Sequence, residues 1–301
     1  MGRSVQAIKI IIIWSFMLLS LQAWGATVGL LVDSQSEQIV AFKDQLQRLR
    51  SVDQIQLITT PQLSEINKED IQKWITLGPK ALNALLPALN QSKSPVLALF
   101  LPDAMRVQLS GKYQKSFSTL DNSPTLSRQL ALIQAIAPQA KQVGVFYSSQ
   151  YRVDQKAINS VANQYDLKLQ WAELKDPLDW DRQALKVLSD VDLVLGVSDD
   201  ALYNTTTIRS ILMRLYRSGI ALVGPDKGYV RAGAVASVYS GIPEVLKASS
   251  AWLAGELADS PIIPNPYFDV SVNGQVARSL NIVVDDEASL TKQVKEVTRA
   301  Q

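Results

Sequence analysis

The sequence predicts an α/β protein of two lobes, each built on a doubly wound parallel β-sheet. Short runs of β-branched and leucine residues alternate with amphipathic stretches of helical spacing over most of the 301 residues, and this alternation is typical of parallel sheets with helices on both faces. The pattern also restarts, because residues 28–35 (VGLLVDSQ) and 143–150 (VGVFYSSQ) lie 115 positions apart and share their first two and last two residues. One long sheet is the alternative, but a repeat at this offset favours two lobes.

The first half contains four predicted strands and two predicted helices. The strands are expected at residues 28–32, 55–59, 74–77 and 96–101, and the helices at 36–50 and 79–89. Pro79 suits the first turn of its helix, because the N–H that proline lacks has no helical partner there.

The second half repeats this order from residue 143 onward. Helices are expected near residues 151–164, 179–188 and 206–218, and strands at 167–172, 191–197 and 221–224. The acidic residues at 285–287 precede a terminal helix, where carboxylates favour the positive end of the helix dipole.

Residues 1–25 have the three parts of a secretory signal peptide. Two basic residues and no acid come first, an apolar run follows at residues 10–21, and small residues appear around 23–26, as in cleaved leaders. A membrane anchor is the alternative, but spanning a bilayer takes roughly 20 apolar residues. We therefore expect export to the periplasm, cleavage after Gly25 or Ala26, and no membrane span in the processed chain.

The amino-acid composition limits the kinds of partner that the chain can bind. The chain contains no cysteine, which excludes disulfides, thiolate metal sites and a lipid on an N-terminal cysteine. Without the two basic residues of the leader, 28 basic residues balance 28 acidic ones. A neutral chain has no electrostatic reason to bind nucleic acid or anionic lipid, so neither is expected as a principal partner.

The same composition argues against an enzyme. The chain has no histidine, so the commonest general base is missing along with the thiol nucleophile. It has no nucleophile elbow, phosphate-binding loop or dinucleotide-binding fingerprint. Carboxylate pairs remain, as in glycoside hydrolysis, but no spacing singles one out. No catalytic residue, cofactor or metal ligand is therefore expected.

Three stretches resemble a known family. They are residues 128–147 (RQLALIQAIAPQAKQVGVFY), 229–240 (YVRAGAVASVYS) and 270–282 (VSVNGQVARSLNI). Together they resemble the uncharacterised-type ABC transporter substrate-binding family, which has the type I periplasmic-binding-protein fold and includes members that bind aromatic amino acids. Residues 77–81 (LGPKA) look like the family's glycine turn, whereas its Asn-x-Thr-Gly turn and a histidine after the first strand are absent.

The resemblance implies a hinge that the chain crosses three times. Lobe 1 is then expected to comprise residues 26–121 plus 240–265, and lobe 2 residues 122–239 plus 266–301. Type I proteins hold their ligand between the two lobes, which close on it by hinge motion.

Ligands of open α/β sheets bind outside the carboxyl ends of the strands, so polar residues that follow predicted strands are the candidates for ligand binding. These candidates are Asp33, Ser34, Gly78, Tyr147, Ser148, Ser198, Asp199, Asp226 and Tyr239.

Each candidate also has a structural interpretation. Ser34 or Ser36 can cap the helix that follows, Ser198 and Asp199 can cap a turn, and Tyr239 can pack the hinge. For an α-amino acid ligand, the carboxylates of Asp33, Asp199 and Asp226 are acceptors for the ammonium group. The free N–H groups near Gly78 or Ser34 are donors for its carboxylate.

Two functions fit these predictions, and a third is weaker. The first is a periplasmic solute-binding protein that delivers a small molecule, such as an amino acid or an aromatic compound, to an ABC permease. The second is a ligand receptor for a membrane signalling protein. The third, suggested by the absent family turn and histidine, is a degenerate lobe pair that acts as a protein-interaction module.

Overall fold

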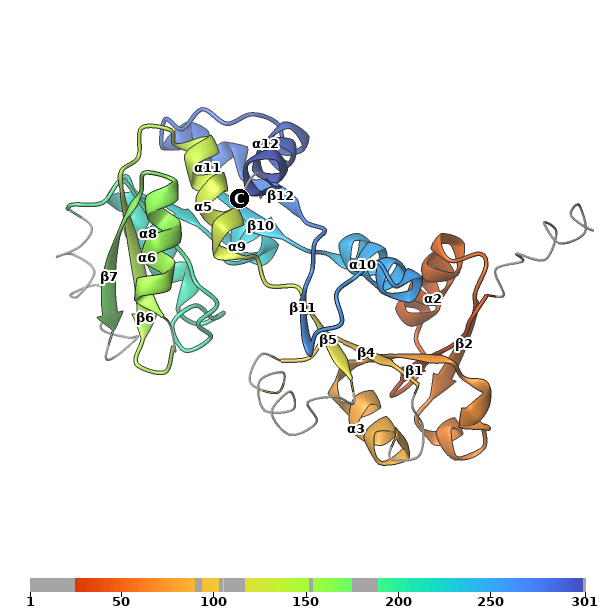
Figure 1. Cartoon of the computed structure of the whole chain (residues 1–301). Helices are drawn as coiled ribbons and strands as arrows, with labels where there is room; N and C mark the ends of the chain where they lie inside the picture. The colour runs from red at the N-terminus through yellow and green to blue at the C-terminus, as the bar shows by residue number, and fades with distance from the viewer. Residues whose placement is uncertain are drawn as a thin grey trace, which may run out of the picture. The chain divides into compact units, whose positions relative to one another are not determined.

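The computed structural model (Figure 1) describes residues 25–89, 94–102, 105, 117–151, 154–174 and 189–299. Contacts divide the chain into two compact units. The first unit contains the described residues up to Leu120 together with Ser249–Ile263, and the second contains Asp121–Ala248 and the described residues from Pro264 onward. The chain therefore passes three times from one unit to the other.

The first unit is built on a six-stranded sheet of order β11-β5-β4-β3-β1-β2, in which β1 to β5 pair in parallel (Figure 1). Its strands are β1 (Thr27–Val32), β2 (Gln54–Thr59), β3 (Lys73–Leu77), β4 (Val96–Leu99), β5 (Ser118–Asp121) and β11 (Ile262–Pro264). Its helices are α2 (Glu37–Leu49), α3 (Gly78–Leu89) and two short 3₁₀ turns at Pro61–Ser64 and Lys68–Asp70. Helix α10 (Ile242–Ala254) contains the second passage between the units.

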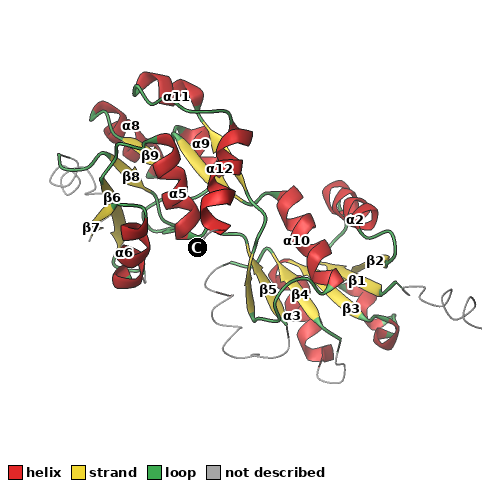
Figure 2. Cartoon of the chain, turned by 45° about the horizontal axis from the view of Figure 1, so that its top comes forward, coloured by secondary structure: helices red, strands yellow, loops and turns green. Residues whose placement is uncertain are grey.

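The second unit also has a six-stranded sheet, with the order β12-β10-β9-β8-β6-β7. Strands β7, β6, β8 and β9 of this sheet are labelled in Figure 2. Its strands are β6 (Gln142–Ser148), β7 (Lys168–Leu174), β8 (Leu193–Leu195), β9 (Ala221–Val223), β10 (Ala236–Tyr239) and β12 (Asp269–Val272). Its helices are α5 (Leu126–Ile136), α6 (Gln155–Gln164), α8 (Ile208–Arg217), α9 (Lys227–Ala232), α11 (Gly274–Ser279) and α12 (Glu287–Arg299). Strands β6 to β10 are parallel, and β12 runs antiparallel to β10.

The two sheets confirm the two-lobe prediction, because β1 and β6, which carry the repeated sequence, occupy the same place in each sheet. The predicted elements within the described residues are present with small shifts at their ends. One strand was predicted too long: residues 96–101 form a strand only to Leu99, because Phe100 adopts a left-handed backbone (φ 58°) that cannot continue it. The helix predicted near 179–188 lies outside the described residues.

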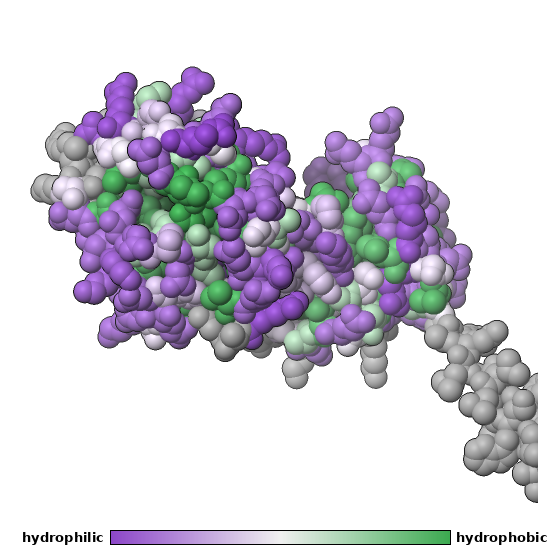
Figure 3. All heavy atoms as spheres, turned by 90° about the horizontal axis from the view of Figure 1, so that it is seen from above, coloured by the Kyte–Doolittle hydropathy of each residue, from purple (hydrophilic) through white to green (hydrophobic). Residues whose placement is uncertain are grey.

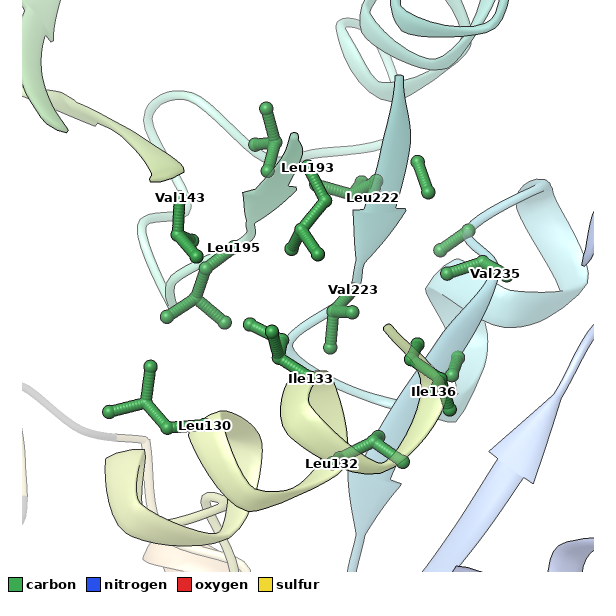
Figure 4. Close-up of a cluster of buried hydrophobic side chains, with 14 of the residues drawn as sticks. Leu130, Leu132, Ile133, Ile136, Val143, Leu193, Leu195, Leu222, Val223 and Val235 are labelled. Atoms are coloured by element: carbon green, nitrogen blue, oxygen red, sulfur yellow. The ribbon is translucent and has the colours of Figure 1, made fainter. Parts of the chain in front are cut away.

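The cores follow from the apolar strands. In the second unit, Leu130 and Ile133 of α5 pack against Leu195 of β8 and Val223 of β9 (Figure 4). In the first unit, Trp74 is fully buried beside Gly29, where an added Cβ would lie 2.6 Å from the indole ring. In the first unit, packing therefore requires the glycine of the repeated Val-Gly pair, because a side chain at Gly29 would collide with Trp74.

Two buried hydroxyls of the first sheet have no hydrogen-bond partner among the described residues. They belong to Thr76 of β3 and Thr119 of β5, which lie on either side of Ala98 in register across the sheet. An unsatisfied buried hydroxyl costs free energy, and removing it with retention of shape is neutral or stabilising.

We expect Thr76→Val to raise the free energy of unfolding by about 1 kcal/mol, because valine keeps the shape and removes the unpaired hydroxyl. Thermal denaturation followed by circular dichroism measures the change. Thr59→Val is the matched control, since the Thr59 hydroxyl donates to Gln62 Oε1 at 2.8 Å and its loss brings no gain. A melting temperature lowered by Thr76→Val would contradict the assignment.

Candidate ligand-binding site

Each sheet reverses its winding at its first strand. Strand β2 lies on one side of β1 and β3 on the other, and β7 and β8 flank β6 in the same way. Ligands of open α/β sheets bind outside the carboxyl ends of the strands at such a reversal. Ligand contacts are therefore expected at the ends of β1, β3, β6 and β8, where most of the predicted residues lie.

In the first unit, the reversal is bridged by an ion pair. The Lys80 Nζ atom in the first turn of α3 lies 3.1 Å from Asp33 Oδ2, just after β1. The two side chains are 78% and 50% exposed, so water and salt screen the pair and it contributes little to stability. Both charges are available to a solute, and Ser34 is exposed beside them.

Two neighbouring residues have a clear local role. Ser36 caps α2, because its hydroxyl accepts a hydrogen bond from the Ile39 amide at 3.3 Å, which confirms the capping interpretation for this serine. Gly78 has a positive φ of 83°, a conformation that glycine adopts without steric cost. It opens α3, whose first amides have no helical acceptor.

Phe100 is an aromatic residue that the sequence analysis missed at this edge. It follows β4, is 41% exposed, and holds a left-handed backbone that is rare for a bulky side chain. Its ring meets the ring of Phe42 edge to face, with 6.3 Å between centroids. An exposed aromatic held in a strained conformation at a strand end is a candidate ligand contact.

In the second unit, the reversal is bridged by a buried carboxylate. Asp199 is 5% exposed, and its oxygens accept hydrogen bonds from the Ser148 amide (2.6 Å), the Ser148 hydroxyl (3.0 Å) and the Ala201 amide (3.2 Å). Ser148 is itself buried. These bonds join the end of β6 to the loop after β8, so both residues fix the shape of the edge.

Three other predicted residues lie at the edges of this unit. Tyr147 packs edge to face on Trp171, and its hydroxyl accepts a hydrogen bond from Gln155 Nε2 at 3.0 Å. Ser198 is exposed after β8. Tyr239, at the end of β10, accepts a hydrogen bond from Lys227 Nζ at 3.0 Å, and this bond raises the pKa of Lys227.

Asp226 opens onto a pocket of about 440 Å³ in the second unit. The pocket lies between the loop after β8, the start of α8 and helix α9. It is lined by Asp200, Tyr203, Asn204, Thr205, Ile208, Asp226, Gly228, Tyr229 and Ala232. Its walls are mainly apolar, and its charged lining residues are two carboxylates. Asp226 also caps α9 through Oδ1, which accepts from the Gly228 amide at 2.5 Å.

The two tyrosines of this pocket are held in place and stay neutral. The Tyr229 hydroxyl donates to the Tyr203 carbonyl at 2.6 Å, and their rings meet edge to face at 6.3 Å. Burial, followed by the negative charge of Asp226, raises the pKa of Tyr229 to about 12, and burial also raises the pKa of Tyr203. Both phenols therefore remain protonated at physiological pH, and a neutral aromatic ring attracts cations to its face.

A second hollow of the same unit has a different character. It is lined by residues 135–140, Asp192 and residues 281–283, before the start of β6, and Val283 is 91% exposed. Figure 3 shows a hydrophobic area framed by hydrophilic surface on this unit. The hollow lies at the amino end of the strands, away from the edge where open sheets bind ligands.

In the structure, the predicted residues thus lie in different surroundings. The structure joins Asp33 to Lys80 and Ser148 to Asp199, and it places Asp226 in a pocket with residues that the prediction did not include. The candidates remain predictions as ligand contacts. Lys80 and Tyr229 were missed because they lie in helices, and Tyr203 because it lies well beyond the end of β8, so only the folded chain shows that they reach the edge.

The described residues contain no group of three or more histidine, cysteine, aspartate or glutamate side chains that could hold a metal ion. They also contain no helix long and apolar enough to cross a membrane.

Two lobes, each a mostly parallel sheet with helices, and a chain that passes between them three times define a protein with the fold of the type I periplasmic binding proteins. The model of the family described as "ABC transporter substrate binding protein" matches residues 70–250. The chain belongs to this family, as the resemblance in the sequence predicted. No curated protein sequence matches the chain.

Solved structures show the same fold at low sequence identity. A ligand-free, open substrate binding protein with adhesive properties from Clostridium difficile is 14% identical, with a TM-score of 0.63 over 87% of this chain and 96% of that one. An ABC domain in complex with L-Trp from Streptococcus pneumonia is 16% identical, with a TM-score of 0.51 over 89% and 98%. A conserved domain protein from Vibrio cholerae is 16% identical, with a TM-score of 0.50 over 88% and 98%.

Proposed function

We propose that the chain is an exported solute-binding protein that captures a small molecule at the carboxyl ends of its strands and delivers it to an ABC importer. Membership of the substrate-binding family supports the general role. The observation that carries the proposal is the pocket at the ends of β8 and β9, where apolar walls surround a few convergent polar groups. This is the usual character of a small-molecule site, and the proposal includes no catalytic step.

The lining of this pocket favours a ligand with an ammonium group next to an apolar or aromatic body. Asp200 and Asp226 supply negative charge, and Tyr229 supplies a neutral ring. Asp199 is a poorer acceptor for the ammonium group, because three hydrogen bonds within the chain already occupy its oxygens. In the first unit, Lys80 and the free amides at the start of α3 suit a carboxylate. An aromatic amino acid has the ammonium group and the aromatic body that this pocket favours, and the fold relative from Streptococcus pneumonia is in complex with L-Trp.

The proposal includes transfer across the inner membrane and release into the periplasm. The basic start, the apolar run at 10–21 and the small residues around 23–26 support a cleaved leader. The processed chain then meets its solute outside the cytoplasm, as delivery to an importer requires.

Isothermal titration calorimetry tests the function with residues 26–301 and a set of matched solutes. L-Trp, L-Tyr and L-Phe are the expected ligands, tyramine tests the ammonium group without a carboxylate, and ribose and myo-inositol are uncharged controls. We expect a measurable heat of binding with at least one of the amines. In a parallel thermal denaturation, the same amine should raise the melting temperature, since a ligand at 100 times its dissociation constant stabilises the folded state by about 2.7 kcal/mol. Binding of a sugar alone would overturn the ligand class, and no binding by a folded protein would contradict the solute-binding role.

A further inference from the structure

The start of the first strand is held by a hydrogen bond from a main-chain nitrogen to a carboxylate. The Ala26 nitrogen, directly before β1, donates to Asp53 Oδ1 at 2.8 Å. The Ala26 carbonyl accepts from the Gln54 amide at 3.0 Å. Both bonds tie Ala26 to the chain that opens β2.

Asp53 is built into the fold as a buried charge. It is 6% exposed, and its second oxygen, Oδ2, accepts from Arg50 Nε at 2.6 Å. Its own amide donates to the Arg50 carbonyl, and its carbonyl accepts from Gln47 Nε2 at 2.7 Å. The carboxylate is thus aimed at the Ala26 nitrogen by the turn between α2 and β2. Arg50 is thus the cationic partner of Oδ2, while Oδ1 faces the neutral Ala26 amide of the unprocessed chain.

The second unit shows the ordinary form of this arrangement. Its first strand begins with the amides of Lys141 and Gln142, which donate to Asp192 Oδ2 at 2.7 and 2.8 Å. Asp192 is exposed to water, so its charge needs no further partner. Asp53 differs because it is buried, and a buried carboxylate is stabilised more by a cationic donor than by a neutral one.

The residue before Ala26 has no room for a side chain. A Cβ built on Gly25 would lie 1.3 Å from the Val52 carbonyl oxygen. Glycine at this position and alanine two residues earlier are also the small residues that a signal peptidase accepts before its cleavage site.

We infer that the Gly25–Ala26 bond is the processing site, and that the ammonium group released on Ala26 forms an ion pair with Asp53 which stabilises the first unit only after cleavage. Water adds across the amide: Gly25 leaves with the new carboxylate, and the Ala26 nitrogen becomes the chain's α-ammonium group. The inference rests on the export in the proposed function, but it makes no use of the ligand.

The Ala26 nitrogen does not have to move for this ion pair to form. It already lies at hydrogen-bond distance from Asp53 Oδ1, and cleavage adds a positive charge and two further donor hydrogens. The carboxylate already makes the bond to the amide a charge-assisted one, and the new positive charge on the nitrogen turns this bond into an ion pair at a buried carboxylate. The mature chain should therefore be more stable than a chain that keeps even one residue of the leader.

Intact mass spectrometry of the protein recovered from the periplasm tests the processing site, with Ala26 as the expected first residue. Thermal denaturation then compares chains that begin at Ala26, begin at Gly25, or begin at an N-acetylated Ala26. We expect the chain with a free Ala26 ammonium group to melt about 2–4 °C above both others, the shift that a modest ion pair produces in a domain of this size. Asp53→Asn, which retains an acceptor oxygen but no charge, should abolish the difference.

Processing at another bond, or equal melting temperatures for the three starts, would overturn the inference. If Asp53→Asn does not fold, the acetylated chain still decides, because acetylation removes the charge and leaves Asp53 unchanged. Amino acid affinity should be equal in all three chains. A failure of the solute-binding proposal therefore leaves this comparison intact, and the reverse also holds.

Discussion

Replacing Asp199 by alanine is expected to lower the free energy of unfolding of the second unit by about 3 kcal/mol, the cost of stranding buried hydrogen-bond donors of a charged acceptor. The substitution leaves the amide and hydroxyl of Ser148 without their acceptor in a buried place. Urea denaturation followed by circular dichroism and tryptophan fluorescence measures the change. Trp171 lies in the second unit, whereas Trp74 and Trp252 lie in the first, so the fluorescence reports the unfolding of both units.

Two variants separate this effect from a general loss of charge. Asp200→Ala changes the exposed neighbour and should alter stability by less than about 0.5 kcal/mol, as is usual for a surface site. Ser148→Ala removes only the hydroxyl and should cost about 1 kcal/mol. Equal effects of Asp199→Ala and Asp200→Ala would show that the buried carboxylate does not hold the edge together.

The double change Asp200→Asn and Asp226→Asn is expected to weaken binding of an aromatic amine by about 100-fold. Each hydrogen bond to a charged group contributes about 1.5–3 kcal/mol, and a factor of 100 is at the low end for two such groups. Asparagine keeps the size of both side chains, and it is a good helix cap, so α9 retains its start at residue 226. Titration calorimetry with L-Trp and tyramine measures the loss.

The matched control for this prediction is Asp154→Asn. Asp154 caps α6 by accepting from the Lys156 and Ala157 amides at 3.1 Å, and it does not line the pocket. Its replacement should leave affinity unchanged. If the double variant still binds as tightly as the original chain, the ammonium group is held elsewhere, and Asp33 becomes the first alternative.

The fold was predictable because the signal is periodic and repeated. Continuous apolar strands such as residues 28–32 and 143–147 are buried on both faces, which is the sequence pattern of a parallel sheet. Capping residues were also predictable: Asp286 Oδ1 accepts from the Ala288 and Ser289 amides at 3.0 Å, as the acids before the last helix indicated. Both features depend on residues close together in the chain.

The site was less predictable because its contacts join distant residues. Asp199 follows a strand just as Asp226 does, yet one is buried under Ser148 and the other is exposed at a pocket. Strand-end placement gives both residues the same prediction, and only the packing of β6 against β8 separates them. Phe100 was predicted to lie within a strand and was not considered as a ligand contact. Nothing in the apolar run of residues 96–101 indicates that the backbone adopts a left-handed conformation at this residue.

The two reversal points follow the two copies of the repeated strand sequence, but they differ in rigidity. In the second unit, the buried and hydrogen-bonded side chains of Ser148 and Asp199 are already ordered, so a contact formed beside them would cost little conformational entropy. In the first unit, the side chains of Asp33 and Lys80 are exposed, and each would lose rotamer freedom before it could hold another group. A contact at the second reversal therefore costs less ordering than the same contact at the first.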